Sequence, residues 1–409
     1  MLLHHSERLE LSSLNDRKLN KTLNICNIDL MAYKFLLPWL RALQSYTEEN
    51  HLACCFGVCK DRLAKENLVL HHLPIQRTWN PFRNLRALIA TVRLLRSDRW
   101  DIIVVHSATA AAVARVACML TGFRPVMYVM HGMYATEHTP FFPRIISNAV
   151  ERVLAAVTDA FQFVSEEDLK TARTSGILKR HHQAFWGCVG VSASIFRPDP
   201  EIGAAVRERW QIPADAIVVG VVARVVREKG FVEFFSMARE IAASVSSVRF
   251  MIVGDSLPSD RDGILPELKS WIVQTGISDR FIFVGFTDAV SDYLNSMDIF
   301  VLPTYREGFP VSVMEAMSTG LPVVTTSIRG CREAVVHGVT GLLVPPRDSR
   351  SLTDAVLSLV QDRSKRHAMG EAGRKRIIES FEEKSMADAF VRHLLATWRA
   401  SISASVANC

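Results

Sequence analysis

The chain has 409 residues, of which 49% are hydrophobic and 22% charged, so it can bury two cores and is too apolar for wholesale disorder. Its eight cysteines contain no C-x-x-C pair, which excludes the usual spacing of a metal site or a disulfide framework. The net charge of +6 is concentrated in the first 196 residues and suggests an anionic surface or substrate on that side.

The first half of the chain alternates between apolar strand-like runs and helical runs. Residues 1–20 are too charged for a secretory signal and predict a short flexible leader. The expected strands are LNICNID (23–29), HLACCFGV (51–58), DIIVVH (101–106), PVMYVMH (125–131) and DAFQFVS (159–165). Continuous apolar strands between helices are typical of parallel β-α units, so residues 21–196 predict one doubly wound α/β domain.

The pattern restarts after a linker at FRPDPEIG (196–203). The expected strands there are AIVVGVVAR (216–224), VRFMIVGD (248–255), RFIFVGF (280–286), DIFVLPTY (298–305), LPVVTT (321–326) and GLLVPP (341–346). We therefore predict a second doubly wound domain over 197–385, and a helix over 386–409 that crosses back to the first domain. In such parallel sheets ligands bind at the carboxyl ends of the strands.

A basic helix is expected between residues 77 and 100, where Arg83, Arg86, Arg93 and Arg96 alternate with apolar residues. One interpretation is an ordinary amphipathic surface helix. The other is a helix that lies on anionic lipid headgroups.

Two carboxylates, Glu307 and Glu315, lie eight positions apart around the end of the strand 298–305. Gly308 permits close approach of a ligand, and Pro310 suits the first turn of the following helix, whose free N–H groups favour an anion. This arrangement suits a ligand with hydroxyl groups at both ends and a phosphate between them, such as a nucleotide sugar. Because Glu307 falls in a turn, its removal is expected to cost little folding stability.

Two cations, Arg224 and Lys229, follow the strand 216–224 and can hold a diphosphate. Lys229 would also stabilise the negative charge that develops on a departing diphosphate. The alternative for this loop is solvated surface charge. Neither half contains G-x-G-x-x-G after a strand, which argues against a dinucleotide site.

The motifs together resemble the retaining GT-B glycosyltransferases of family 4. They are E-G-F-P-x3-M-E-A-M-x2-G-x-P-V-V (307–324), G-x2-E (330–333), H-G-x2-G-x-L-V-P-P-x-D (337–348), G-V-V-A-R…E-K-G (220–230), F-V-G (283–285) and GVSASIFRP (190–198). The resemblance is strong over about residues 187–348 and weaker in the first half, through WDIIVVHS and YVMHG. It implies two Rossmann-like domains with a cleft between them.

The resemblance also implies roles for the matching residues. Glu307 would bind the donor sugar's hydroxyls, Glu315 the ribose, and Arg224 and Lys229 the diphosphate. His131 would face the sugar from the first domain. The remaining donor contacts would come from the backbone near the base, from Phe283 through Gly285 to Phe286, and near the sugar and phosphate, at Gly308, Phe309, Pro310 and Val311.

The reaction implied by the resemblance is sugar transfer with retention of the anomeric configuration. The family usually needs no metal, and no other cofactor is expected. The donor is expected to be a UDP-sugar, with a hexose or N-acetylhexosamine transferred to a glycan.

The acceptor side departs from the family pattern. Where many relatives carry a Gly-Gly loop, this chain has NIDLMAYKFLLP (27–38), in which Tyr33 and Lys34 suggest a bulkier acceptor lining. These residues could instead pack a helix against the sheet. His106 also ends a strand and is a weaker candidate on the acceptor side.

We expect a lipid-pyrophosphate-linked acceptor in bacterial capsule, exopolysaccharide or O-antigen assembly. The protein would then be cytoplasmic, with its basic N-terminal domain at the inner face of the membrane, and would bind no nucleic acid. One alternative is a soluble small-molecule or protein acceptor. An alternative of another class is a non-catalytic scaffold subunit that binds nucleotide sugars.

Overall fold

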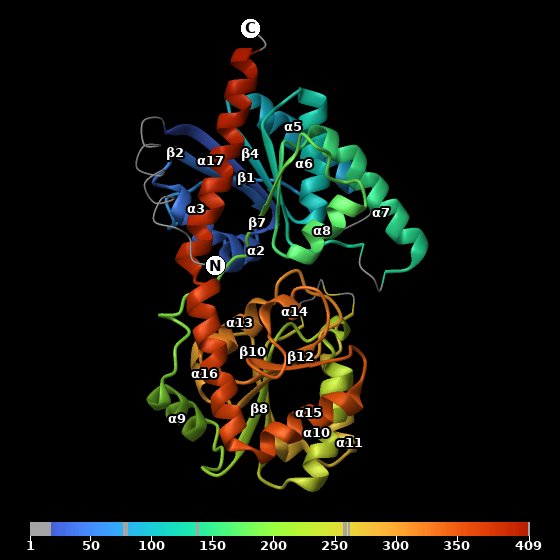
Figure 1. The fold of residues 1–409 in the computed structure, drawn as a ribbon, viewed down its shortest axis with the longest axis vertical. Coiled ribbons are helices and arrows are strands. Elements are labelled where there is room, and N and C mark those ends of the chain that lie inside the picture. The colour runs from blue at the N-terminus through green and yellow to red at the C-terminus, as the bar shows by residue number, and fades with distance from the viewer. Residues whose placement is uncertain (1–17, 77–80, 136–138, 257–259, 261, 408–409) are drawn as a thin grey trace. The chain divides into compact units, whose positions relative to one another are not determined.

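The computed structural model describes residues 18–407 except 77–80, 136–138, 257–259 and 261. Most of the predicted leader at 1–20 therefore lies outside the described residues. The chain divides into two compact units (Figure 1). One contains the described residues up to Val189 together with those from Met386 onward, and the other is Gly190–Ser385.

The N-terminal unit is built on a seven-stranded parallel sheet in the order β3-β2-β1-β4-β5-β6-β7. Its strands are β1 (Leu19–Ile28), β2 (Thr47–Cys55), β3 (Val69–His72), β4 (Ile102–His106), β5 (Val126–Met130), β6 (Ala160–Phe163) and β7 (Gln183–Trp186). The five strands expected from the apolar runs all form. The edge strands β3 and β7 were not predicted.

Helices cover both faces of this sheet (Figure 1). Val104 of β4 packs in one core with α3 and the C-terminal helix, while Val105 packs in a second core with α5 and α6. The alternation follows from the period of two along a strand. The helices are α2 (Asp29–Met31), α3 (Leu37–Leu43), α4 (Lys60–Leu63), α5 (Pro81–Ser97), α6 (Ala108–Thr121), α7 (Phe141–Leu154) and α8 (Glu166–Thr174), with a π-helical turn at Ala32–Leu36 and a 3-10 turn at Ala155–Val157.

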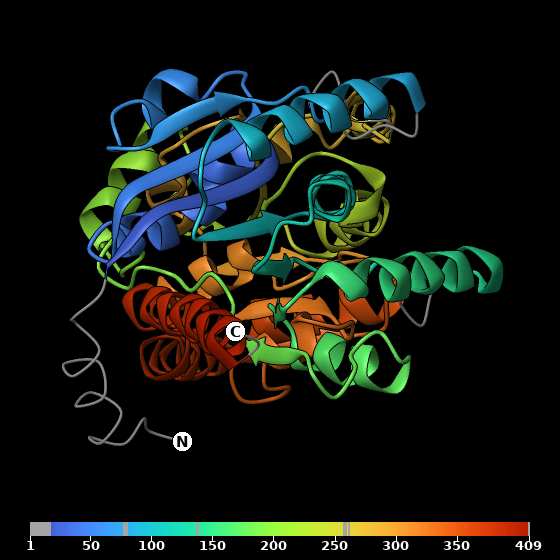
Figure 2. The ribbon, with the colours of Figure 1, turned by 90° about the horizontal axis from the view of Figure 1, so that it is seen from above.

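α5 is the predicted basic helix. It buries Ala87 and Leu95 and exposes its arginines, as both interpretations of this helix require. α7 reaches outward beyond the other elements of this unit (Figure 1, Figure 2).

The C-terminal unit has a six-stranded parallel sheet in the order β10-β9-β8-β11-β12-β13. Its strands are β8 (Ile217–Val222), β9 (Val248–Val253), β10 (Phe281–Gly285), β11 (Ile299–Leu302), β12 (Val323–Thr326) and β13 (Gly341–Val344), all within or overlapping the six expected runs. Its helices are α9 (Pro200–Arg209), α10 (Phe231–Ser244), α11 (Leu265–Gln274), α12 (Val290–Asn295), α13 (Val311–Ser318), α14 (Cys331–Ala334), α15 (Ser349–Gln361) and α16 (Arg363–Ser380), with 3-10 turns at Arg227–Lys229 and Ser278–Arg280.

In both sheets the strand order reverses next to the first strand, between β1 and β4 and between β8 and β11. The prediction of two doubly wound parallel sheets is confirmed. The loops that follow the two strands at such a reversal diverge and leave room for a ligand at the carboxyl edge. In the C-terminal unit, these are the loops that carry the predicted donor residues.

The C-terminal helix α17 (Glu383–Ala407) begins in one unit and continues into the other. Its Phe390 is fully buried and stacks on Trp39 of α3, with ring centroids 4.6 Å apart. The predicted crossing of this helix to the first domain is confirmed. Among the helices in the described part of the chain, none is both long and apolar enough to traverse a bilayer.

The first unit ends at Val189, a few residues before the boundary expected between Phe196 and Arg197. The reason is that the carbonyl oxygen of Phe196 accepts hydrogen bonds from Ser318 Oγ and Arg374 Nη1, at 2.6 and 3.2 Å. These contacts hold the start of the predicted linker against the C-terminal unit.

Candidate active site

The centre of the site is an ion pair between Lys229 and Glu307. Lys229 ends a 3-10 turn after β8, and Glu307 follows β11, which pairs with β8 in the sheet. Lys229 Nζ lies 2.5 Å from Glu307 Oε1, and the two side chains are only 18% and 12% exposed. The expectation that Glu307 is an exposed turn residue is therefore wrong, because the neighbouring loop covers it and supplies its counter-charge.

The loops that carry this pair are fastened to each other. The amide of Tyr305 donates to the carbonyl of Glu228 at 2.8 Å, and the Tyr305 hydroxyl donates to Glu233 Oε2 at 2.5 Å. Gly230 has a φ of +76° and lies so close to Pro303 that an added Cβ would stand 1.9 Å from the Pro303 carbonyl oxygen. Only glycine satisfies both conditions, so this residue allows the close approach of the Lys229 loop to the Glu307 loop.

Arg224, the second predicted cation, is also paired. Its guanidinium donates to Asp260, whose side chain is 7% exposed, while that of Arg224 is 38% exposed. Asp262 accepts from the amide of Glu228 at 3.2 Å and so ties the same segment to the β8 loop. The sequence analysis missed Asp260. The signal was available, because Asp260 follows β9 and Arg224 follows β8, and these two strands are neighbours in the sheet.

The helix α13 begins immediately after Pro310, as predicted. Its first intrahelical bonds run from Val313 and Met314 to the Pro310 carbonyl, so the amides before them project from the helix start. Val311, Ser312 and Glu315 are the partly exposed residues of its first turns. The spacing i, i+1, i+4 places them on one face, and thus sets Glu315 on the same face as the anion-binding end of the helix.

A second close backbone contact joins Gly308 and Gly330. Gly330 has a φ of +73°, and an added Cβ there would stand 2.4 Å from the Gly308 carbonyl oxygen. Cys331 follows and is fully buried, and burial, with the charge of Glu307, raises the pKa of its thiol to about 12. The backbone near Glu307 is therefore held from both sides by well-packed loops.

The predicted base contacts lie at the end of β10. Gly285 has a φ of +77°, and its carbonyl oxygen accepts from the amide of Gly254 at 2.9 Å. The Phe283 ring lies under Lys269, with the ammonium 5.3 Å from the ring centre. Gly285 ends β10 at the carboxyl edge of the sheet, and Phe283 lies two residues before it.

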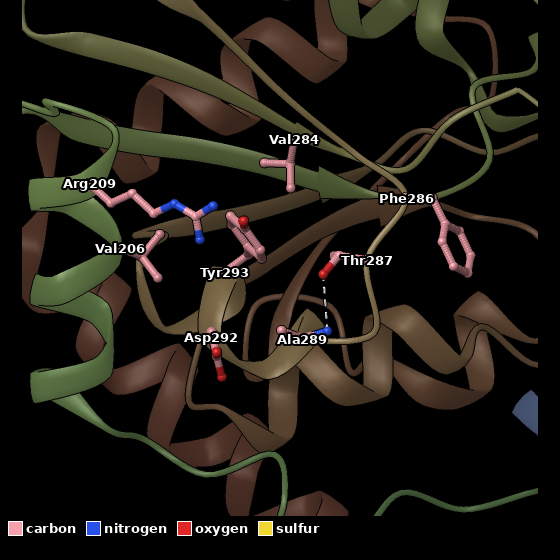
Figure 3. Close-up of a pocket in the computed structure, with 8 residues that line it drawn as sticks. All are labelled: Val206, Arg209, Val284, Phe286, Thr287, Ala289, Asp292 and Tyr293. Carbon is pink, nitrogen blue, oxygen red and sulfur yellow. Dashed lines mark hydrogen bonds between the residues drawn. The ribbon is translucent and has the colours of Figure 1, made fainter. Parts of the chain in front are cut away.

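A pocket of about 320 Å³ opens next to this strand end, between α9 and the β10–α12 segment (Figure 3). It is lined by Val206, Arg209, Val284, Phe286, Thr287, Ala289, Asp292 and Tyr293. Val284 and Phe286 fall within the segment from Phe283 to Phe286 whose backbone is expected to contact the base. None of the residues expected to bind the sugar or the diphosphate lines the pocket.

In the N-terminal unit, His131 is the end of a hydrogen-bond chain. His131 Nε2 lies 3.3 Å from His106 Nδ1, and His106 Nε2 lies 3.2 Å from Asn24 Oδ1. Asn24 Nδ2 donates to Asn50 Oδ1 at 3.3 Å, and Asn50 Nδ2 donates to the carbonyl of Leu40 at 2.8 Å. The backbone carbonyl at the far end fixes the direction of the whole chain, because each amide must present its oxygen to the preceding donor.

This direction assigns the tautomers of both histidines. His106 donates through Nε2 and accepts at Nδ1, so His131 donates through Nε2 and keeps Nδ1 as an acceptor. Burial lowers the pKa of His131 to about 4 and that of His106 well below its ordinary value. Both rings are therefore neutral near pH 7. The sequence did not point to Asn24, whose polar side chain interrupts an apolar strand.

His106 is 1% exposed and is bonded through both ring nitrogens. This burial argues against the direct acceptor contact expected for His106. Its geometry instead suits positioning of His131.

Tyr33 and Lys34 lie on the π-helical turn after β1. Ala32 and Leu36 of the same turn are fully buried, while Tyr33 and Lys34 are partly exposed and Arg62 covers the Tyr33 ring at 5.3 Å. The turn thus packs against the sheet through Ala32 and Leu36 and leaves Tyr33 and Lys34 partly exposed. The acceptor role of Tyr33 and Lys34 stays a prediction.

Comparison with known proteins assigns the family. Residues 204–376 match the family described as "Glycosyl transferases group 1", and residues 45–185 match "Glycosyl transferase 4-like domain". The chain belongs to the group 1 glycosyltransferases. The predicted resemblance is confirmed.

This glycosyltransferase is similar to proteins of bacterial surface-glycan synthesis. It is 25% identical to the capsular polysaccharide biosynthesis glycosyltransferase CapM of Staphylococcus aureus, over 78% of this chain and 83% of CapM. It is 24% identical to an Escherichia coli UDP-Gal:alpha-D-GlcNAc-diphosphoundecaprenol alpha-1,3-galactosyltransferase, over 73% of this chain and 76% of that one.

Among solved structures, Anabaena Alr3699/HepE in complex with UDP and glucose superimposes with a TM-score of 0.78 at 20% identity. The match covers 92% of this glycosyltransferase and 99% of HepE. At this identity the likeness establishes the fold, which is GT-B.

The glycosyltransferase thus holds its predicted site residues in two groups. One group, around Lys229 and Glu307, lies at the carboxyl edge of the C-terminal sheet. The other, His131 with His106, lies at the carboxyl edge of the N-terminal sheet. In the described part of the chain no three His, Cys, Asp or Glu side chains gather as a metal site would require.

Proposed function

We propose that this glycosyltransferase moves a hexose or N-acetylhexosamine from a UDP-sugar to a glycan acceptor with retention of configuration. The observation that carries the proposal is the Lys229–Glu307 pair, which places a cation and a carboxylate 2.5 Å apart beside the start of α13. The C-terminal unit binds the donor in this proposal, and the N-terminal unit binds the acceptor.

The geometry suits a donor whose charge lies in the middle and whose hydroxyls lie at the ends. Glu307 accepts hydrogen bonds from the sugar, and Glu315 accepts them from the ribose. Lys229, Arg224 and the first amides of α13 surround the diphosphate. These groups are fixed before the reaction, so they stabilise the charge that develops on the departing UDP without reorganisation.

Because both cations already form ion pairs, a bound donor must compete with the carboxylates for them. Lys229 and Arg224 neutralise Glu307 and Asp260, so a diphosphate must share these cations with the carboxylates. Sharing is favourable because a diphosphate carries more charge than one carboxylate and lies where several donors converge. Glu307, relieved of part of its neutralising charge, becomes a better acceptor for sugar hydroxyls.

The proposed acceptor is a lipid-pyrophosphate-linked glycan in cell-surface polysaccharide synthesis. The name of the Escherichia coli relative describes transfer to a diphosphoundecaprenol-linked sugar. The excess positive charge of the first half of the chain also favours a pyrophosphate and an anionic membrane surface. The protein would then work at the inner face of the cytoplasmic membrane.

The test is release of UDP from UDP-glucose, UDP-galactose, UDP-GlcNAc and UDP-GalNAc, with and without an undecaprenyl-diphosphate-linked acceptor. We expect acceptor-dependent release with one or a few donors and a product with the donor's anomeric configuration by NMR. Transfer to water-soluble acceptors alone would favour the soluble-acceptor alternative. A protein that binds UDP-sugars but releases no UDP would favour the scaffold, and an inverted product would overturn the proposed mechanism.

A further inference from the structure

The helix α7 has its polar and apolar faces reversed with respect to a normal surface helix. Its apolar residues Phe142, Ile146 and Val153 are 76%, 64% and 62% exposed. Its polar residues Ser147 and Asn148 are partly buried against the unit. The exposed apolar face is formed by Phe141, Phe142, Ile145, Ile146, Ala149, Val150 and Val153.

Polar contacts fasten the other side of α7 to the unit. Glu151 forms an ion pair with the fully buried Arg115 of α6, with Nη2 and Oε2 2.9 Å apart. Arg152 Nε donates to the carbonyl of Ser175 at 2.8 Å, and Leu154 is buried. An amphipathic helix normally turns its apolar stripe to the core. Here buried polar bonds set the opposite orientation, which leaves an apolar face along a helix of 14 residues that the described residues leave exposed.

Cations surround the carboxyl end of this face. Arg152 is exposed on α7 itself, and the following segment exposes Arg173, Lys179 and Arg180. That segment is tied to the end of α7, because His182 Nε2 lies 3.1 Å from the carbonyl oxygen of Ala155.

Acidic residues are mostly directed elsewhere. Glu166 and Glu167 lie at the opposite end of α8 from Arg173, and Glu151 is engaged with Arg115. The carboxyl end of the apolar face of α7 is therefore bordered by a net positive charge.

We propose that α7 lies on an anionic lipid bilayer, with its apolar face inserted at the boundary between headgroups and acyl chains and its bordering cations on lipid phosphates. An exposed apolar face with basic residues beside it is the pattern of helices that lie in the membrane plane. A second copy of the chain is a poorer occupant. A two-fold contact with the two α7 helices parallel would bring the Arg152, Arg173, Lys179 and Arg180 clusters together, and like charges at an interface oppose association. An antiparallel contact would leave these cations beside the interface without a partner of opposite charge on α7.

The test is co-sedimentation of the full chain with vesicles of phosphatidylcholine containing phosphatidylglycerol, and with vesicles of phosphatidylcholine alone. The wild type should bind the anionic vesicles, bind them less at high salt and bind neutral vesicles weakly. The variant Phe142→Gln/Ile146→Gln should lose at least about tenfold in partition, because two inserted side chains are made polar. The assay contains neither donor nor acceptor, so it does not depend on the proposed reaction.

The matched control is Val273→Gln/Ile378→Gln. It makes two exposed apolar residues of the C-terminal unit polar, 69% and 48% exposed in the wild type, and should bind vesicles like the wild type. A further measurement uses a variant that keeps the face apolar. The variant Ile146→Trp should show an emission shift to shorter wavelength on adding anionic vesicles that exceeds the shift of the wild type, whereas Val273→Trp should not.

Any of three results would overturn the proposal. The first is equal binding of the wild type and the Phe142→Gln/Ile146→Gln variant, and the second is no binding of the wild type to anionic vesicles. The third is a dimer of the wild type by light scattering that this variant abolishes, without any vesicle binding, which would assign the face to a second copy.

Discussion

Lys229 Nζ lies 2.5 Å from Glu307 Oε1 across two loops that follow neighbouring strands. Neither residue is a solvent-exposed charge at the surface. Each is the other's counter-ion in a mostly buried place, so a substitution of either one affects both the charge that meets a donor and the stability of the loops.

The first prediction concerns Glu307→Gln. The amide keeps the shape of the carboxylate but removes its charge, so it weakens the bonds to the sugar hydroxyls and leaves Lys229 without a counter-ion. We expect turnover to fall by about 10²–10³-fold, as for loss of one preorganised group in other enzymes. UDP release under saturating donor measures the effect.

Glu267→Gln is the control for this variant. Glu267 also pairs with an arginine of the same unit, at 3.6 Å, but is 46% exposed. It should keep wild-type turnover. Near-wild-type turnover of Glu307→Gln would show that the Glu307 carboxylate takes no part in the reaction.

The second prediction separates the charge of Lys229 from its shape. Lys229→Ala should raise the KM for the donor and lower kcat, because both the bound diphosphate and the departing one lose a cation. Lys229→Arg keeps the charge but replaces a compact ammonium with a planar fork, so it should recover donor binding better than turnover. Steady-state kinetics with varied donor gives the two constants separately. Equal damage by both substitutions would mean that Lys229 acts only by packing.

The third prediction concerns the contact between the two loops. Gly230→Ala puts a Cβ against the Pro303 carbonyl oxygen at a φ of +76°, whereas Gly338→Ala has a φ of +77° and nothing within 4 Å of the new atom. Both changes incur the left-handed backbone cost of about 1–2 kcal/mol. Only Gly230→Ala should add about 1–3 kcal/mol of steric strain and reduce turnover by displacing Lys229. Denaturant unfolding and UDP release compare the two, and equal losses would contradict the assigned role of the close contact.

The central strands could be predicted from the sequence because they are buried on both faces and read as continuous apolar runs. The edge strands β3 and β7 could not, because their residues are mostly half-buried or exposed and carry no such run. The two units were expected from the restart of the pattern, but the start of the second depends on hydrogen bonds of Phe196 that no local pattern records.

The candidate site was predictable residue by residue but not as a set of pairs. Glu307 and Lys229 were singled out separately, and their contact arises from the order of strands in the sheet, which brings β8 next to β11. The same is true of Asp260 beside Arg224. Likewise, the apolar periodicity of α7 indicates an amphipathic helix, but contacts distant in sequence, such as the Arg115–Glu151 ion pair, determine which face it turns outward.

The fourth prediction follows from the low pKa of His131. Burial lowers this pKa from an ordinary 6.5 to about 4, so both the folded and the unfolded chain hold a neutral ring well above pH 6.5. Between about pH 6.5 and 4 the unfolded chain binds a proton that the folded chain does not. The free energy of unfolding should therefore decrease as the pH is lowered through this window, by up to about 1.4 kcal/mol per pH unit from this histidine.

His131→Gln removes this proton linkage while keeping a donor towards His106. The buried His106 and the half-buried His393 also have lowered pKa values, so the variant should still lose stability in acid, but over a shallower slope than the wild type. Denaturant unfolding at pH 7 and pH 5 measures the slopes. His367→Gln, at a side chain 75% exposed on α16, should match the wild type because this side chain lies mostly in solvent in the folded chain. Parallel slopes for His131→Gln and the wild type would show that His131 is not kept neutral by its surroundings, and the tautomer assigned through Asn24 would lose its basis.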